Sequence, residues 1–271
     1  FKAGAYQVSK SMTLDEIIEE LSGKGKEKNL NATKVVIREG EQLSDISKEV
    51  AKSTKYSAED FMAKVQDSGF IELLVQKYPK LLTQSYNSYN VKYVLEGFLF
   101  PATYDMNDNK TLQMLITEMV AKTDEVMSKY YDKILKSDYT LQQILALASL
   151  IEKEGTKLED RKKISSVFHN RIKENMKLQT DVSVQYALGE HKESLSLSDL
   201  EVDSPYNLYQ NYGVGPGPYN SPSEDSIVAA LEPEKTDYLY FLADIHTKEI
   251  YYAKTYEEHL VLKAKYIDSK E

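Results

Sequence analysis

The residues best suited to chemistry are two carboxylates, Glu152 and Glu154, at the end of a long apolar segment that begins after Thr140. Apolar residues cover most of the helical circumference of this segment, which predicts a buried helix that ends at Gly155. At 100° per residue, both carboxylates border the buried arc of that helix. Burial raises the pKa of a carboxyl group, as a general acid near neutral pH requires. The same position equally suits a carboxylate that binds N–H groups or an arginine at a helix junction.

The chain offers few other chemistries. It contains no Cys, so neither a disulfide nor a thiolate metal site can form. The His residues do not follow a ligand spacing such as His-x-x-x-His, and they predict no metal site: His169, His191, His246 and His259. Prolines interrupt the glycines of "YGVGPGPY" at residues 212–219, which argues against a phosphate-binding loop. We therefore expect no metal and no organic cofactor.

The composition is that of a folded, acidic protein. Apolar residues make up 41% of the 271 residues and charged residues 28%, and the formal net charge is -9. A nucleic-acid-binding protein normally presents a basic face, so no nucleic-acid partner is expected. No apolar run approaches the ~18 residues that a membrane span needs. Any membrane anchor is therefore expected to precede Phe1.

The first third of the chain predicts a small α+β unit. A strand is expected at residues 33–37, a turn at residues 38–41 and a capped helix from Ser44 onward. A second helix is expected at residues 58–66. This order, which includes "REGEQLSDISKEV", loosely resembles a LysM module, a small peptidoglycan-binding fold, over about residues 33–77. An ordinary α+β packing unit explains the order equally well.

The remaining elements follow from apolar periodicity and capping residues. A strand is expected at residues 1–6, and a helix at residues 14–23. Polar residues 77–90 are predicted to connect an N-terminal region, residues 1–92, to a mainly helical domain, residues 93–271. The elements expected in that domain are helices at 111–129, 140–155, 164–172 and 181–189 (capped by Asp181), a helix that starts at Ser221 and Pro222, and a β-hairpin of residues 238–243 and 250–253.

Several segments resemble those of a known enzyme family, in the same order and along nearly the whole chain. They are "FKAGAY" at residues 1–6, "EGFLFPATY" at 96–104, "ASLIEKEG" at 148–155, "VFHNRIKENMKLQTDVSVQYALG" at 167–189, "SPYNLY" at 204–209 and "TDYLYFLAD" at 236–244. The family is the YceG-like or MltG family, the endolytic murein transglycosylases. The resemblance implies an α+β fold, with a LysM-like subdomain before a lysozyme-like, mainly helical catalytic domain that ends in the β-hairpin.

The resemblance also implies the residues of the site. The catalytic acid of the family matches the second Glu of "EKE", which is Glu154, and Gly155 stands where related enzymes carry a hydroxyl residue. The expected substrate-binding residues are Glu96, Glu152, Gln179, Thr180, Asp181, Tyr206 and Asn207. The loop "YGVGPGP" at residues 212–218 departs from the Leu-Pro-Pro-Gly-Pro pattern of the family, so this part of the cleft rim is not predicted.

The implied activity is endolytic cleavage of the β-1,4 bond between N-acetylmuramic acid and N-acetylglucosamine in nascent peptidoglycan, which leaves 1,6-anhydro ends. One alternative is a muramidase that hydrolyses the same bond, with Asp181 or Glu96 as its second carboxylate. Another is a non-catalytic, glycan-binding scaffold of the division or elongation machinery. The implied partners are glycan strands and cell-wall synthases, the penicillin-binding proteins. A single-pass anchor before Phe1 would place this part outside the cell membrane.

Overall fold

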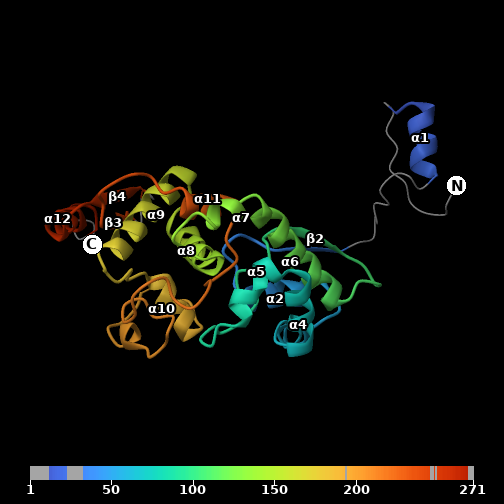
Figure 1. The fold of residues 1–271 in the computed structure, drawn as a ribbon, viewed down its shortest axis with the longest axis horizontal. Helices are drawn as coiled ribbons and strands as arrows, with labels where there is room; N and C mark the ends of the chain where they lie inside the picture. Colours follow the sequence, from blue (N-terminus) through green and yellow to red (C-terminus); the bar gives the residue numbers. More distant parts are fainter. Residues whose placement is uncertain (1–11, 23–32, 193, 245–246, 248, 268–271) are drawn as a thin grey trace.

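A computed structural model describes residues 12–22, 33–192, 194–244, 247 and 249–267 of the chain (Figure 1). It is an α+β protein, and the strand expected at residues 1–6 lies outside the described residues. The first elements are α1 (Leu14–Leu21), β1 (Thr33–Val36), α2 (Leu43–Ser53), α3 (Ala58–Val65), α4 (Ser68–Lys77), α5 (Pro79–Tyr86), β2 (Thr103–Met106), α6 (Leu112–Ser128) and α7 (Tyr131–Ile134). They are followed by α8 (Leu141–Glu154), α9 (Leu158–Lys173), α10 (Asp181–Leu188), the 3-10 helix η1 (Asp199–Glu201), α11 (Glu224–Leu231), β3 (Tyr240–Ala243), β4 (Ile250–Ala253) and α12 (Tyr256–Tyr266).

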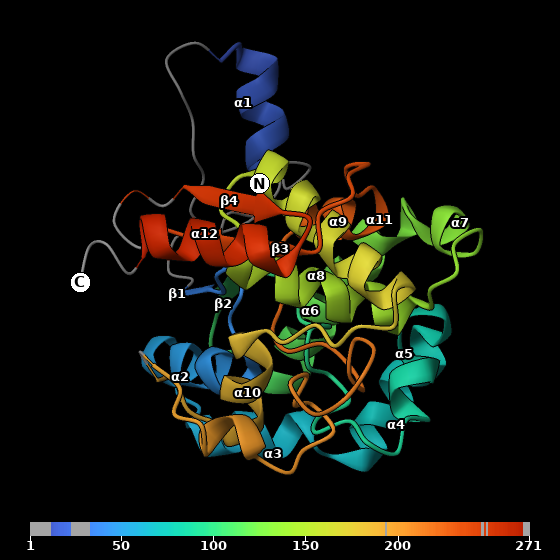
Figure 2. The same ribbon diagram turned by 90° about the vertical axis from the view of Figure 1, so that its left-hand side faces the viewer.

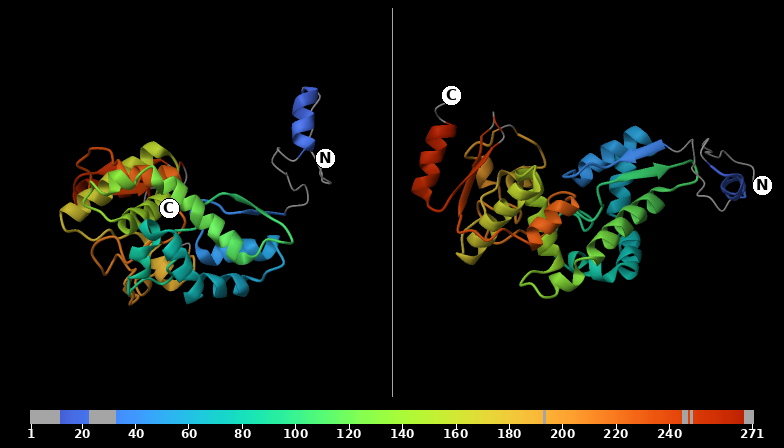
Figure 3. Two further views of the ribbon diagram at one scale, coloured as in Figure 1. Left: turned by 45° about the vertical axis from the view of Figure 1, so that its right-hand side comes forward. Right: turned by 90° about the horizontal axis from the view of Figure 1, so that it is seen from above.

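A short antiparallel sheet joins two distant parts of the sequence. In the pairing of β1 with β2, Thr33 lies opposite Met106 and Val36 lies opposite Thr103 (Figure 3). The helix α2 packs on β1 and on α3, and α3 in turn contacts α6. The sheet therefore takes one strand from each side of residues 92–93, where the sequence predicts a domain boundary.

Residues 77–90 do not form the polar connection that the sequence predicts. They contain the end of α4 and all of α5, which begins with Pro79 at its first position. Leu81 and Leu82 are buried, and α5 contacts both α4 and α8. The prediction is wrong because the polar residues cover only one side of α5, while the two leucines anchor its other side in the core.

The central helix is α8, which is surrounded by other helices (Figure 1). Thr140 caps it in a capping box with Gln143, and nearly all of its residues up to Ile151 are buried. It contacts α5, α7, α9, α10 and α11. The buried helix that the sequence predicts is therefore confirmed, and its burial on many sides fixes the position of Glu154 at its end.

The close packing of α9 explains the glycine after α8. Gly155 has extended backbone angles, with φ -127°, so no left-handed conformation demands a glycine here. A Cβ atom at this position would instead lie 3.0 Å from Arg161 Cγ and 3.0 Å from Ile164 Cδ1. The small residue thus lets α9 approach the end of α8.

Ser223, and not Ser221, caps α11. The Ser223 hydroxyl accepts a hydrogen bond from the N–H of Ser226 at 3.2 Å. Ser221 is used elsewhere, because its carbonyl accepts from Gly40 N–H at 2.8 Å and its N–H donates to the Glu41 carbonyl at 2.9 Å. These two hydrogen bonds attach the turn before α2 to the segment that leads into α11.

The C-terminal β-hairpin is formed by β3 and β4, with Tyr240 opposite Ala253. The helix α12 packs against both strands, and β3 contacts α9 (Figure 2). The hairpin expected at residues 238–243 and 250–253 is confirmed, although β3 begins two residues later than predicted.

Candidate active site

Glu154 lies at the end of α8 with a carboxyl group suited to proton transfer. Thr180 Oγ1 donates a hydrogen bond to Glu154 Oε1 at 2.7 Å. Burial raises the pKa of Glu154 above its usual value. The hydrogen bond from Thr180 opposes this rise, whereas the negative charge of Asp181 adds to it. The residue nevertheless keeps part of its surface exposed, so a ligand can reach it.

A pocket of about 630 Å³ opens beside Glu154. Its walls come from the start of α2, the end of α8, and α10 with the loop that follows: Gln42, Ser44, Asp45, Lys48, Lys153, Glu154, Asp181, Val182, Gln185, Gly189, Glu190 and His191. Figure 2 shows α10 beside α2, in agreement with this lining. The candidate catalytic group therefore lies in a pocket that the N-terminal region helps to form.

The sequence reasoning missed the wall that α2 provides. All the site residues it predicted follow residue 95, because the matched catalytic segments lie there. One signal was available: Gln42, Asp45 and Lys48 are three residues apart, a spacing that places polar side chains on one face of a helix. In the structure Lys48 Nζ lies 3.3 Å from Asp45 Oδ1, and both line the pocket.

The backbone is strained at Gln179, the residue directly before Thr180, which binds Glu154. Gln179 has a φ of 51°, in the left-handed region that non-glycine residues seldom adopt. Its N–H donates to the carbonyl of Leu208 at 3.1 Å, which helps to hold this conformation. The Gln179 side chain is exposed and next in sequence to the residue that binds Glu154. This placement is compatible with the predicted role in binding.

Asp181 also lines the pocket, but it does not cap α10 as the sequence predicts. Thr180 occupies the cap position, and Asp181 is the first residue of the helix. The Asp181 carboxylate accepts a hydrogen bond from Tyr209 Oη at 2.7 Å. A carboxylate in the first turn also interacts favourably with the helix dipole.

Glu152 does not line the pocket, and its predicted role in substrate binding stays a prediction. Its side chain is only 5% exposed and forms a buried ion pair with Arg161, at 2.7 Å from Nη2. It also accepts hydrogen bonds from the N–H and hydroxyl groups of Ser223. Arg161 completes the junction by donating through Nε to the Gly155 carbonyl at 2.9 Å. Glu152 thus has the alternative role of a carboxylate at a helix junction.

Glu96 is likewise buried, with 1% of its surface exposed, and it does not line the pocket. It accepts a hydrogen bond from the N–H of Leu43 at 3.0 Å, and it lies 3.2 Å from Tyr186 Oη. Burial raises the pKa of Glu96 to about 8. In this structure Glu96 therefore links α2 with α10, and its predicted contact with substrate stays a prediction.

Tyr206 and Asn207 are also buried and do not line the pocket, and their predicted role in substrate binding stays a prediction. The Tyr206 ring packs against Tyr186 and Tyr219, with ring centroids 4.7 Å and 5.3 Å away. The Asn207 side chain is fully buried and binds only backbone groups of its own loop: the carbonyls of Leu200 and Val202 and the N–H of Tyr209. Both residues therefore stabilise the conformation of the segment that contains them.

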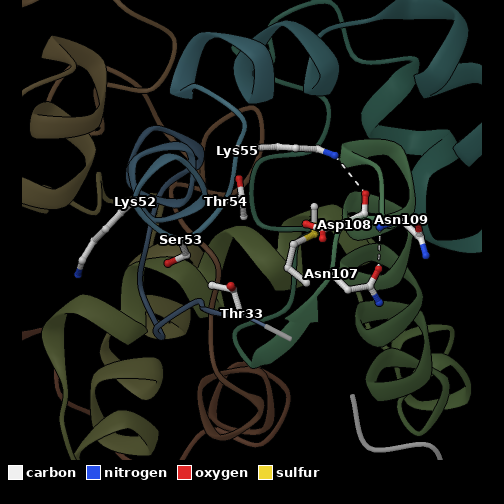
Figure 4. Close-up of a pocket in the computed structure, with 9 residues that line it drawn as sticks. Thr33, Lys52, Ser53, Thr54, Lys55, Asn107, Asp108 and Asn109 are labelled. Carbon is white, nitrogen blue, oxygen red and sulfur yellow. Dashed lines mark hydrogen bonds between the residues drawn. The ribbon is translucent and has the colours of Figure 1, made fainter. Parts of the chain in front are cut away.

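A second depression, of about 540 Å³, lies at the far end of α2 (Figure 4). It is lined by Thr33, Lys52, Ser53, Thr54, Lys55, Met106, Asn107, Asp108 and Asn109. It includes no residue of α8 or α10 and is therefore separate from the site around Glu154. Within the residues that the structure describes, no group of three or more His, Asp or Glu side chains could hold a metal ion.

Comparison with known proteins gives consistent results over the whole chain. The YceG-like family model matches residues 1–265. The endolytic murein transglycosylase of Bacillus subtilis (strain 168) is 44% identical over 271 residues, which cover 100% of this chain and 74% of that protein. The endolytic murein transglycosylase of Streptococcus pneumoniae serotype 2 is 40% identical over 282 residues, which cover 99% of this chain and 51% of that protein. The chain thus spans about half the length of the streptococcal relative.

A solved structure supports the same relationship. The crystal structure of a YceG-like protein from Listeria monocytogenes superimposes with a TM-score of 0.82 at 42% sequence identity. The match covers 97% of this chain and 85% of that chain.

Proposed function

Because the chain belongs to the YceG-like family, we propose that it is an endolytic lytic transglycosylase of peptidoglycan. The relatives that bear the name endolytic murein transglycosylase support this activity and this substrate. The single observation that carries the proposal is the placement of Glu154, a partly buried carboxyl group that Thr180 orients in a pocket. Its raised pKa suits a group that must first donate a proton.

One carboxyl group is sufficient for the proposed reaction. Glu154 first gives its proton to the glycosidic oxygen, and the bond from that oxygen to C1 of N-acetylmuramic acid breaks. The C6 hydroxyl of the same sugar then bonds to C1 and gives its proton to Glu154. The acid is regenerated, the product carries a 1,6-anhydro end, and no water is consumed. A hydrolase would need a second carboxyl group to activate water or to form a covalent intermediate.

Because of Asp181, hydrolysis is the alternative to the proposed reaction. It lines the same pocket as Glu154 and could serve as the second carboxylate of a muramidase. In the transglycosylase, its negative charge has a different effect, since it helps to raise the pKa of Glu154. The products distinguish the two reactions, because hydrolysis leaves reducing ends.

The N-terminal region is proposed to be a LysM-like module that binds glycan next to the catalytic pocket. Two features support this: the order β1, α2, α3 and the antiparallel pairing of β1 with β2, which follows two further helices. The contribution of α2 to the pocket around Glu154 supports a role in positioning the strand. The module would then be built from segments on both sides of residues 92–93.

The cellular setting is also a proposal. Since the substrate lies outside the cytoplasmic membrane, the described part would work on the extracytoplasmic side, attached by the single anchor that the family resemblance implies. Within the described ranges, no helix is long and apolar enough to cross a membrane. Penicillin-binding synthases are the expected partners, because they produce nascent strands. Protease accessibility in intact cells and crosslinking to these synthases test the two statements.

Incubation with purified sacculi tests the proposed function. The wild-type protein is expected to release soluble glycan fragments, whereas Glu154→Gln, which keeps the shape but cannot supply a proton, is expected to release almost none. Circular dichroism must show that the variant is folded. Binding of sacculi without release by the wild-type protein would support the scaffold alternative instead.

A further inference from the structure

Lys153 is a cation in the pocket, directly before Glu154 in the sequence. The two acidic residues beside it in the sequence have other partners, because Glu152 pairs with Arg161 and Glu154 accepts a hydrogen bond from Thr180. Among the residues that the structure describes, none forms an ion pair or a hydrogen bond with the Lys153 side chain, which is exposed. Its positive charge is therefore available to a ligand of the pocket.

The Lys153 side chain reaches from the end of α8 to the turn before α2. A Cβ atom at Gly40, in that turn, would lie 3.2 Å from both Cε and Nζ of Lys153, so the glycine leaves room for this side chain. Gly40 also has a φ of 75°, which favours glycine. The ammonium group is thus placed where α8 meets the N-terminal region, and both of these contribute to the pocket.

The other titratable side chains of the pocket already have partners. These are Lys48 with Asp45 at 3.3 Å, Glu190 with Lys192 at 3.2 Å, Asp181 with Tyr209 at 2.7 Å, Glu154 with Thr180 at 2.7 Å and His191 with Gln185 at 2.7 Å. These contacts reduce the repulsion that the acidic groups exert on a negatively charged ligand. An anionic group that enters the pocket therefore finds its uncompensated opposite charge at Lys153.

The proposed substrate carries such an anionic group near the bond that is cleaved. The N-acetylated sugars of a glycan strand are uncharged. The carboxylates belong to the stem peptide, which is joined through an amide bond to the lactyl group of N-acetylmuramic acid. Since Glu154 is proposed to act at C1 of that sugar, the stem peptide of the same sugar lies close to Glu154, and Lys153 is the next residue along α8.

We propose that Lys153 binds a carboxylate of this stem peptide, and that the enzyme therefore prefers strands whose stem peptides are negatively charged. The inference rests on the proposed function of the pocket and adds a specificity-determining residue to it. Because Lys153 is exposed, its ion pair with the peptide stays accessible to water. An ion pair of this kind contributes a modest free energy, which corresponds to a preference of about five-fold.

Two forms of the same soluble glycan strands test the preference. One form keeps its stem peptides unchanged. In the other, carbodiimide and excess methylamine convert the carboxylates into methylamides, which removes the charge and keeps the sugars and the peptide chain. The kcat/KM of the wild-type protein should be about five-fold higher on the charged strands than on the neutralised strands. In Lys153→Gln this ratio should fall to about one, whereas Lys153→Arg, which keeps the charge, should retain the preference.

A matched control separates the contact at Lys153 from the effect of net charge. Lys122 lies on α6, in an exposed pair with Glu125, and does not line the pocket. Lys122→Gln removes the same charge and should keep the preference of about five-fold. An influence of Lys153 on the pKa of Glu154 would change the rates on both strands alike and leave their ratio unchanged. The proposal is wrong if Lys153→Gln keeps the preference, or if the wild type has none.

A binding measurement keeps the test independent of catalysis. Folded Glu154→Gln should bind the charged strands about five-fold more tightly than the neutralised strands, and the additional change Lys153→Gln should abolish this difference. If the wild type cleaves neither strand but the difference in binding is present, the proposed function is refuted and the contact at Lys153 is supported. Equal affinities of Glu154→Gln for the two strands would refute the contact.

Discussion

Thr180 Oγ1 donates a hydrogen bond to Glu154 Oε1 at 2.7 Å, and so connects the cap position of α10 with the last residue of α8. A threonine at a helix cap normally uses its hydroxyl to accept from the first turn of the helix, and Thr180 makes no such bond. The position of α10 therefore controls the orientation of the Glu154 carboxyl group.

Replacement of Thr180 should affect catalysis more than folding. In Thr180→Val the donor to Glu154 is lost, and we expect activity near neutral pH to fall by about ten-fold, the equivalent of ~1.4 kcal/mol for a hydrogen bond to a charged group. Because that bond lowers the pKa of Glu154, the alkaline limb of the rate profile should also move to higher pH. Thr180→Ser, which keeps the hydroxyl, is the control. Equal rates for the valine and serine variants would show that the Thr180 hydroxyl does not contribute to catalysis.

Glu152 should contribute mainly to stability. Glu152→Gln leaves Arg161 buried without its charge partner, and the free energy of unfolding should decrease by ~3 kcal/mol. Its activity at a temperature where it is folded should exceed that of Glu154→Gln by far. Glu125→Gln, in the exposed pair with Lys122, is the control and should cost less than ~1 kcal/mol. Chemical denaturation measures both, and similar losses in the two variants would contradict the buried-junction assignment.

Gly97 should be intolerant of any side chain. Its φ of 78° disfavours other residues, and a Cβ atom would lie 2.3 Å from Pro218 Cβ. Gly97→Ala should therefore lower the free energy of unfolding by more than ~2 kcal/mol. Gly69→Ala is the comparison, since a Cβ atom on this helical glycine meets only Asp67 Oδ1 at 3.5 Å, and it should stabilise the protein by ~0.5 kcal/mol. If the two variants had the same melting temperature, the predicted intolerance of Gly97 would be contradicted.

The sequence predicted which carboxyl groups could do chemistry better than it predicted the contacts that position them. Periodicity alone placed Glu152 and Glu154 beside the buried arc of one helix, but only three-dimensional packing decides that Arg161 pairs with the first and not the second. The burial of Tyr206 and Asn207 could not be predicted either, because it depends on aromatic contacts with Tyr186 and on backbone carbonyls of an irregular loop.

The contribution of α2 to the pocket could not be predicted from the sequence for a related reason. The strand β1 precedes β2 by some 70 residues, as the pairing of Val36 with Thr103 illustrates. A contact at such a separation leaves no local pattern, since nothing in either segment specifies its partner. The sequence therefore predicted β1, α2 and α3, but it missed α4, α5 and the way in which these elements pack.

The free energy of unfolding should fall as the pH rises from 5 to 8. A carboxyl group with a raised pKa binds more protons in the folded than in the unfolded protein. Its contribution to stability is therefore complete below its pKa in the unfolded protein, 4.5, and is lost as the pH approaches its pKa in the folded protein, about 8 for Glu96. Wild-type protein should thus be less stable at pH 8 than at pH 5, by on the order of a few kcal/mol. Glu96→Gln should reduce this difference in urea unfolding. An unchanged difference would show that Glu96 is not buried in its neutral form.

The most direct test of the account is the mass of the glycan ends that the protein produces. Digests of peptidoglycan by the wild-type protein should contain 1,6-anhydro-N-acetylmuramic acid ends, each lighter by one water than a hydrolysed end. Folded Glu154→Gln should produce almost none of them. Ordinary reducing ends from the wild type, or anhydro ends from folded Glu154→Gln at an undiminished rate, would contradict the role assigned to Glu154.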